Sequence, residues 1–142
     1  MMAKTDPIAY LSFDGNCTAA MRFYEEVLGG ELFVLTAGAS PMATETPPEL
    51  RDKVMHASLT LPSGGMLFAG DHWPGQPYEG IKGVTLTLNY DTVDEAQRIF
   101  DALSAGGQVT MPMNESFWAK TFGMLTDRYG CPWIVNGEMK PM

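Results

Sequence analysis

The two histidines are the side chains best suited to acid–base or metal chemistry near neutral pH. His56 stands in an alternating segment, and His72 follows Asp71 in a loop that continues with Trp, Pro and Gly. Imidazole changes charge near neutral pH, so either histidine is a candidate general base or metal ligand. A loop histidine beside an acid is more often a paired surface residue, which leaves His56 as the stronger candidate. A single histidine does not build a catalytic metal site, which normally has about three protein ligands.

The two cysteines, Cys17 and Cys131, are the candidates for thiol chemistry. They lack the Cys-x-x-Cys spacing typical of zinc or redox sites and are too few for a disulfide scaffold. A nucleophile formed by Cys131 with His56 is a weak alternative, because nothing in the sequence fixes the distance between them. We expect both thiols to be structural.

Composition and charge limit the class of partner. The chain has 142 residues, a formal net charge of -8 and only 9 Lys and Arg. This length fits a single domain, and so few cations argue against binding to nucleic acid or to an anionic membrane. No stretch is apolar for long enough to span a bilayer, and the first residues do not have the pattern of a secretion signal. We therefore expect a cytoplasmic protein with a neutral or cationic small-molecule partner.

An internal repeat organises the elements that position these residues. A shift of 77 residues places Phe23 on Phe100 and the glycine pair 29–30 on the pair 106–107. Identity between the halves is low, so chance similarity of two units remains the alternative to duplication. The same order of predicted elements in both halves favours duplication.

The first half predicts a strand, a helix and three further strands. We expect Asn16 to cap the helix and Gly29 to end it, since glycine tolerates the left-handed conformation at a helix end. The segment 62–65, Pro-Ser-Gly-Gly, predicts a turn between two strands. The predicted strands cover residues 8–13, 31–36, 53–61 and 66–70.

The second half predicts the same order of elements. Thr92 and Glu95 form the S/T-x-x-E pattern of a helix start, and Gly106 closes that helix. The predicted strands cover residues 84–90, 108–111, 118–126 and 131–136, and the last two are joined by a turn over 127–130. The fold prediction is therefore α+β, with two βαβββ modules, about 7–71 and 82–137, forming a cupped mixed sheet within a single domain.

Strand alternation places several polar side chains on the sheet face opposite the helices. This face receives His56 and Ser58 from one strand and Thr85 and Thr87 from another, and the shift of 77 maps Thr87 onto Tyr10. An open polar surface of an antiparallel sheet is the alternative interpretation. The bulky Trp118, Phe122 and Trp133 favour a lined cavity, although they also suit an ordinary core.

Three segments resemble the signatures of the PhnB-like proteins. The longest is FWAKTFGMLTDRYGCPW at 117–133, which is similar to their carboxy-terminal pattern F-W-G/A…G…D-x-F/Y-G…W. The segment YLSFDGN at 10–16, with the pairs 23–24 and 28–29, resembles their amino-terminal pattern, and VMHA at 54–57 with Gly70-Asp71 resembles the middle one. Together these segments cover most of the chain between residues 7 and 136.

The resemblance places the chain in the vicinal-oxygen-chelate superfamily, also called glyoxalase/bleomycin-resistance/dioxygenase. It implies two βαβββ modules and a homodimer, in a superfamily with glyoxalases, ring-cleaving dioxygenases and antibiotic-sequestering proteins. The PhnB-like branch is often labelled demethylubiquinone-methyltransferase-like. The sequence does not support that label, because no glycine-rich loop follows a strand with an acidic residue beyond it.

The resemblance also implies where metal ligands would stand. Metal-using members place one His, Glu or Gln on each of four strands, and the corresponding positions fall near Ala9 or Tyr10, His56 or Ser58, Thr85, and Ile134. Only His56 is a strong ligand in this set. We therefore expect no tightly bound cofactor or metal, while a divalent metal completed by Asp71 or His72 stays the alternative.

The functional hypothesis is a small-molecule ligand held in the cup of the sheet. The ligand is aromatic or amphipathic, and no catalytic metal takes part. The alternative is a metal-dependent lyase, isomerase or dioxygenase of the glyoxalase type, so the question of enzyme activity stays open. A cup filled by the protein's own aromatic side chains is a third alternative. The predicted ligand-binding residues are Tyr10, His56, Ser58, Asp71, Thr85, Thr87, Trp118, Phe122 and Trp133.

Overall fold

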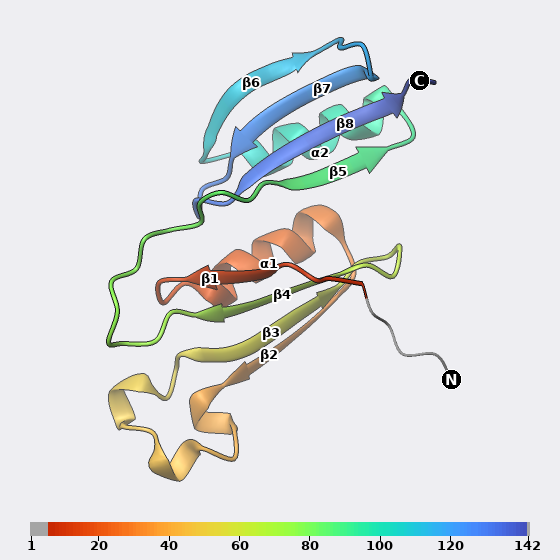
Figure 1. Ribbon diagram of the computed structural model, residues 1–142. Coiled ribbons are helices and arrows are strands. Elements are labelled where there is room, and N and C mark those ends of the chain that lie inside the picture. The colour runs from red at the N-terminus through yellow and green to blue at the C-terminus, as the bar shows by residue number, and fades with distance from the viewer. Residues whose placement is uncertain (1–5, 142) are drawn as a thin grey trace. The chain divides into compact units, whose positions relative to one another are not determined.

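The chain forms two units with the same order of elements. The computed structural model describes residues 6–141. The first unit ends at Gly80, and the second unit begins at Ile81. Each unit has one α-helix that runs along one face of its own four-stranded sheet (Figure 1). The predicted α+β class and the two βαβββ modules are therefore confirmed. The prediction that the modules form a single domain stays a prediction.

The first unit contains a sheet in the order β1-β4-β3-β2. Strands β1 and β4 are parallel, and the other neighbours are antiparallel. A loop with three short 3-10 helices, Ala37–Ala39, Ala43–Glu45 and Pro48–Leu50, joins β2 to β3. The main elements are β1 (Tyr10–Phe13), α1 (Cys17–Leu28), β2 (Glu31–Thr36), β3 (Val54–Thr60) and β4 (Met66–Asp71).

The second unit repeats this topology in the order β5-β8-β7-β6, again with its first and last strands parallel. Its elements are β5 (Leu86–Tyr90), α2 (Val93–Ser104), β6 (Gln108–Asn114), β7 (Ala119–Thr126) and β8 (Pro132–Met139). The predicted strands agree with these except at their ends. Strands β1 and β5 each start two residues later than predicted, so Ile8 and Thr85 lie before the strands.

The shift of 77 residues also relates the strand pairing of the two sheets. Glu31 pairs with Thr60 at the start of β2, and Gln108 pairs with Thr126 at the start of β6. The glycine before each of these strands lies directly against the neighbouring strand, because a Cβ at Gly30 would be 2.0 Å from the carbonyl oxygen of Thr60.

The core of each unit lies between the helix and one face of the sheet. Both helices bury an apolar stripe, and two glycines allow α2 to approach its sheet closely. A Cβ at Gly137 would be 2.7 Å from the Cβ of Ala96, and one at Gly123 would be 2.8 Å from Cε2 of Phe100. The buried stripe residues are Ala20, Met21, Phe23 and Tyr24 in α1, and Ala96, Ile99, Phe100 and Leu103 in α2.

The helix starts differ from one another. Thr92 caps α2 as predicted, since its Oγ1 accepts a hydrogen bond from the Glu95 N–H at 3.2 Å. Asn16 occupies the N-cap position of α1 as predicted, but its side chain makes no capping hydrogen bond. The carboxylate of Asp71 from β4 accepts from the Cys17 N–H at 3.0 Å instead, so a distant residue provides the cap. Within residues 6–141, no helix is both long and apolar enough to span a membrane.

We predict that Gly30→Ala and Gly107→Ala each lower the free energy of unfolding by about 2 kcal/mol, within the usual range for overpacking. A Cβ at Gly107 would stand 2.3 Å from the carbonyl oxygen of Thr126, which matches the crowding at Gly30. Urea unfolding followed by circular dichroism measures the change. Gly65→Ala is the control, because its Cβ would be at ordinary contact distance, 3.6 Å from Ser63 Oγ. Equal stabilities of all three variants would contradict the prediction.

Candidate functional site

Each sheet has a second face that its helix does not cover, which we call the helix-free face. Buried and more exposed residues alternate along the strands, and paired residues on neighbouring strands share a face. In the first unit, this face carries Tyr10, Ser12, Phe33, Leu35, His56, Ser58 and Phe68. In the second unit, it carries Thr87, Asn89, Met111, Phe122, Met124, Ile134 and Asn136.

Three rings meet on the helix-free face of the first unit. The centroid of the His56 ring lies 4.9 Å from that of Phe68 in an edge-to-face arrangement, and 5.8 Å from that of Tyr10. Ser58 pairs with Phe68 across β3 and β4, and Phe33 pairs with Ser58 across β2 and β3. The predicted residues Tyr10, His56 and Ser58 therefore stand in one aromatic surface.

The imidazole of His56 keeps its hydrogen-bonding capacity. No residue among 6–141 forms a hydrogen bond with it, and no buried side-chain nitrogen or oxygen in that range lacks a partner. The ring nitrogens of this half-buried side chain therefore reach solvent. One nitrogen of a neutral imidazole donates and the other accepts, so His56 can bind either kind of polar group or accept a proton.

The hydroxyl of Tyr10 is fixed at the other end of this cluster. It donates to the carbonyl oxygen of Met55 at 3.1 Å, and a Cβ at Gly70 would lie 2.8 Å from it. Although the side chain as a whole is half-exposed, burial of this end raises the pKa of Tyr10, and the neighbouring Cys17 adds to the effect. The hydroxyl therefore stays protonated at neutral pH, and its lone pairs remain able to accept a hydrogen bond.

A second aromatic cluster lies on β7 and the segment before it. The ring of Trp118 packs edge-to-face against Phe122, with centroids 4.7 Å apart, and against Phe117 at 4.8 Å. The side chain of Phe117 is 76% exposed. The predicted residues Trp118 and Phe122 thus form one apolar surface in the second unit, together with Phe117.

Trp118 is anchored by hydrogen bonds at its side chain and its backbone. Its indole Nε1–H donates to Oδ1 of Asn136 at 3.0 Å, and Nδ2 of Asn136 donates to Oδ1 of Asn89 at 2.9 Å. Ser116 Oγ accepts from the Trp118 N–H at 3.3 Å, and the Lys140 N–H donates to the Trp118 carbonyl at 2.7 Å. The indole ring of Trp118 is therefore held in one orientation.

The expectation that Trp133 lines the polar face is corrected by the structure. Trp133 alternates with Ile134 on β8 and faces α2, where it is 1% exposed. Its indole N–H donates to Oδ2 of Asp127 at 2.8 Å, and Oδ1 of Asp127 accepts from the backbone N–H groups of Tyr129 and Cys131. These residues fix the turn between β7 and β8 and belong to the core.

Two further predicted ligand-binding residues also differ from expectation. Asp71 uses both carboxylate oxygens on backbone groups, one on the Cys17 N–H and one on the Val54 N–H at 2.9 Å. It faces α1 and joins the helix start to β3, so it is corrected to a structural residue. Thr85 lies before β5 and outside the strand pairing, whereas Thr87 lies on the helix-free face as predicted.

Several residues of these surfaces were not predicted as site residues. Phe68 and Asn136 lie on the helix-free faces, where their pairing partners are Tyr10 and Asn89. Alternation along β4 and β8 contains the signal that identifies them, once the strand registers are known. Phe117 belongs to the aromatic motif but precedes the strand, so alternation does not place it.

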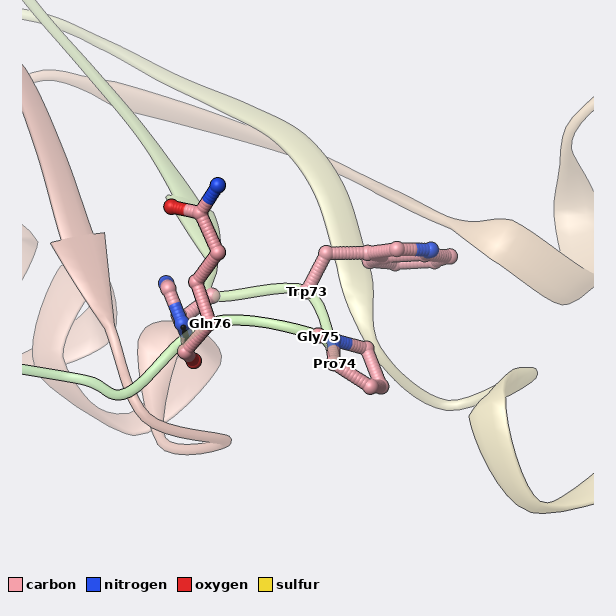
Figure 2. Close-up of a pocket in the computed structure, with 5 residues that line it drawn as sticks. Trp73, Pro74, Gly75 and Gln76 are labelled. Atoms are coloured by element: carbon pink, nitrogen blue, oxygen red, sulfur yellow. Dashed lines mark hydrogen bonds between the residues drawn. The ribbon is translucent and has the colours of Figure 1, made fainter.

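The loop that contains His72 forms a shallow hollow of about 370 Å³, lined by residues 72–76. His72 Nε2 lies 2.6 Å from the carbonyl oxygen of Gln76, so this imidazole is bonded within its own loop. Figure 2 shows the side chains of Trp73 and Gln76 pointing in different directions from that loop. Because five consecutive residues build this hollow and the His72 ring is hydrogen-bonded to Gln76 of the same loop, few polar side chains point together toward a ligand there.

The donor set for a divalent metal is sparse. Within residues 6–141, no group of three His, Cys, Asp or Glu side chains is arranged to hold an ion. The rings packed against His56 belong to Tyr10 and Phe68, which are not strong metal ligands. The side chains packed around His56 in the first unit therefore do not complete a set of ligands for a catalytic metal.

Comparisons with known proteins agree on the fold. The model of the Glyoxalase/Bleomycin resistance protein/Dioxygenase superfamily matches residues 7–135. Protein YjdN of Escherichia coli K12 is 35% identical over 136 residues, which cover 89% of this chain and 91% of YjdN. The crystal structure of protein PA1353 from Pseudomonas aeruginosa has 46% identity and a TM-score of 0.87, and the match covers 95% of this chain and 98% of PA1353. The PhnB protein from Bacillus cereus has 24% identity and a TM-score of 0.75, with 94% and 99% covered.

We predict that neither thiol reacts in the folded protein. Both cysteines are fully buried, and burial, with a smaller effect of the Asp71 carboxylate, raises the pKa of Cys17 from 9.0 to about 12. Ellman's reagent at pH 8 therefore labels no cysteine in buffer and both cysteines in urea. Because Cys17 ionises first in the unfolded chain, its contribution to stability is complete below pH 9 and is lost as the pH rises to about 12. Rapid labelling of folded protein would contradict the structural role.

Proposed function

The chain belongs to the Glyoxalase/Bleomycin resistance protein/Dioxygenase superfamily, and from this premise we propose that it is a PhnB-like protein that binds a small aromatic or amphipathic molecule without a catalytic metal. The observation that carries the proposal is the composition of the two helix-free faces. Each face combines packed aromatic rings with polar nitrogens that form no hydrogen bond with the described residues. These nitrogens belong to the imidazole of His56 in the first unit and to Nδ2 of Asn89 in the second.

The energetics of such a surface favour a flat apolar ligand. Apolar burial contributes about 25 cal/mol per Å², so covering about 100 Å² of ring surface contributes roughly 2.5 kcal/mol. Edge-to-face or stacked contacts with Trp118 add specific aromatic interactions. A polar group on the same face, His56 in the first unit or Thr87 in the second, then orients the ligand through hydrogen bonds.

The charge of the protein supports the choice of ligand. A net charge of -8 repels anions at long range, so a neutral or cationic molecule is favoured. The Lys120 side chain on the helix-free face of the second unit forms an ion pair with Glu138, with their N and O atoms 2.5 Å apart. This cation is therefore already paired with a protein carboxylate. Enclosure of the ligand in a cup of the sheet, and assembly into a homodimer, stay predictions.

The metal-dependent lyase, isomerase or dioxygenase is the less supported alternative. It needs two or more strong ligands beside His56, whereas the neighbouring side chains are aromatic. General-base catalysis by His56 without a metal stays compatible with its accessible nitrogens.

We predict that Trp118→Ala weakens binding of the neutral probes 2-naphthol and quinoline by about 1 to 3 kcal/mol, the range for loss of an anchoring aromatic. Isothermal titration calorimetry measures the affinity, and thermal unfolding verifies that the variant is folded. Trp73→Ala is the control, because Trp73 is 42% exposed in a loop outside both helix-free faces. Equal affinities of the wild type and Trp118→Ala would refute the role of this ring.

We also predict that protein purified without a metal-affinity column contains no stoichiometric zinc, nickel, manganese or iron, as measured by mass spectrometry of the elements. The chain has only two histidines, His56 and His72. The variant His72→Ala is therefore the matched control for His56→Ala. A stoichiometric ion that is lost in His56→Ala and kept in His72→Ala would establish the metal-dependent alternative.

A further inference from the structure

Three side chains on the helix-free face of the second unit form a hydrogen-bonded row whose direction is fixed. An indole nitrogen can only donate a hydrogen bond. Trp118 Nε1–H therefore requires the oxygen of the Asn136 amide at 3.0 Å, which turns Nδ2 of Asn136 toward Asn89. The orientation of an asparagine amide is often ambiguous, but here the donor-only indole determines it.

The orientation of the Asn136 amide in turn determines the orientation of the Asn89 amide. Because Nδ2 of Asn136 is a donor, it requires Oδ1 of Asn89, and the two atoms lie 2.9 Å apart. The carbonyl oxygen of Asn89 therefore already accepts one hydrogen bond, whereas its Nδ2 group is left to donate. Within residues 6–141, no acceptor for Nδ2 of Asn89 is found. Asn89 is exposed, so the row ends at the surface in N–H donors.

Burial of the middle residue makes this direction costly to reverse. Asn136 is 5% exposed, so a flipped amide would set two donors against each other without water to compensate. Each buried polar group without a partner costs about 1 to 3 kcal/mol. The chain of bonds also polarises each amide in the same sense, which strengthens the terminal donor.

From this geometry we infer that the ligand carries an uncharged carbonyl group, whose oxygen accepts a hydrogen bond from Nδ2 of Asn89. The inference rests on the proposed function and names the class of molecule that the face selects. The apolar part of the ligand packs on Trp118, which begins the row, and on Phe122, which pairs with Asn136. A neutral carbonyl fits better than a carboxylate because the protein carries a net charge of -8.

The preference for a ligand oxygen that accepts a hydrogen bond comes from Asn89 in the second unit. In the first unit, His56 offers both a donor and an acceptor, so it accommodates either kind of ligand group. In Asn89, the Nδ2 group is the part that has no partner within residues 6–141, whereas the oxygen already accepts one hydrogen bond. A ligand that presents only an N–H group to Nδ2 of Asn89 would leave two donors facing each other.

The test compares two neutral probes of nearly the same shape, 2-acetylnaphthalene and 2-ethylnaphthalene. Titrations followed by ¹H–¹⁵N NMR measure both affinities and report on the Asn89 amide and the Trp118 indole directly. We expect wild-type protein to bind the ketone about tenfold more tightly, the ratio that corresponds to one hydrogen bond. Asn89→Asp keeps the acceptor for Asn136 and removes the donor, so the ratio falls to about one while the affinity for 2-ethylnaphthalene is unchanged.

Two further variants separate the effect of the hydrogen-bonded row from the effects of added charge and of aromatic packing. Asn16→Asp introduces the same charge at an exposed position of the first unit and keeps the wild-type ratio. Trp118→Phe keeps an aromatic ring but removes the N–H that orients Asn136, so the preference for the ketone decreases. Asn136 and Trp118 act as positioning residues in this scheme, and the ratio of the two affinities reports on positioning independently of packing.

The outcomes distinguish the two proposals. Tight binding of both probes with an unchanged ratio in Asn89→Asp would overturn the carbonyl inference and leave the proposed function intact. No binding of either probe to wild-type protein up to its solubility limit would count against the proposed function itself. A ratio that falls in Asn89→Asp but not in Asn16→Asp supports both.

Discussion

The close approach of each helix to one face of its sheet is the constraint on which the rest of the structure depends. In the second unit this approach requires positions without side chains, and Gly123 and Gly137 provide them under Phe100 and Ala96. Once one face is committed to the helix, strand alternation sends every second residue to the opposite face. The rings of Tyr10, His56 and Phe122 are therefore excluded from the helix-packed core. Aromatic and polar groups gather on the face that the helix leaves uncovered, and this is the chemical basis of the binding surface that we propose in each unit.

The sequence was sufficient to predict the fold because its signals are local. Periods of two and of about 3.6 residues, glycine at helix ends and the 77-residue repeat all act over short distances or recur. The candidate site was predicted in part for the same reason, since alternation within β3 identifies the face of His56 and Ser58. Asp71 was misassigned because its partners, Cys17 and Val54, lie 54 and 17 residues away in the chain. Trp133 was misassigned because aromatic character alone does not say which face of β8 a residue occupies.

The carboxy-terminal motif combines two physical roles. Asp127 and Trp133 hold the turn between β7 and β8 through a buried carboxylate, whereas Trp118 stands on the helix-free face and is oriented by Asn136. A motif of this kind identifies a fold, because residues such as Asp127 and Trp133 hold the turn on which the sheet depends. It specifies a reaction poorly, since the side chains that meet a ligand are free to differ while the turn stays the same.

The parallel pairing of the first and last strands in each unit has a consequence for biosynthesis. Strand β1 pairs with β4, and β5 pairs with β8, so the first strand of each unit has no partner in its sheet until the last has left the ribosome. The first unit has all its strands once Asp71 has emerged, before any strand of the second unit exists. Synthesis from the amino terminus thus presents the two βαβββ sequences one after the other, an order that favours strand pairing within each repeat over pairing between the repeats.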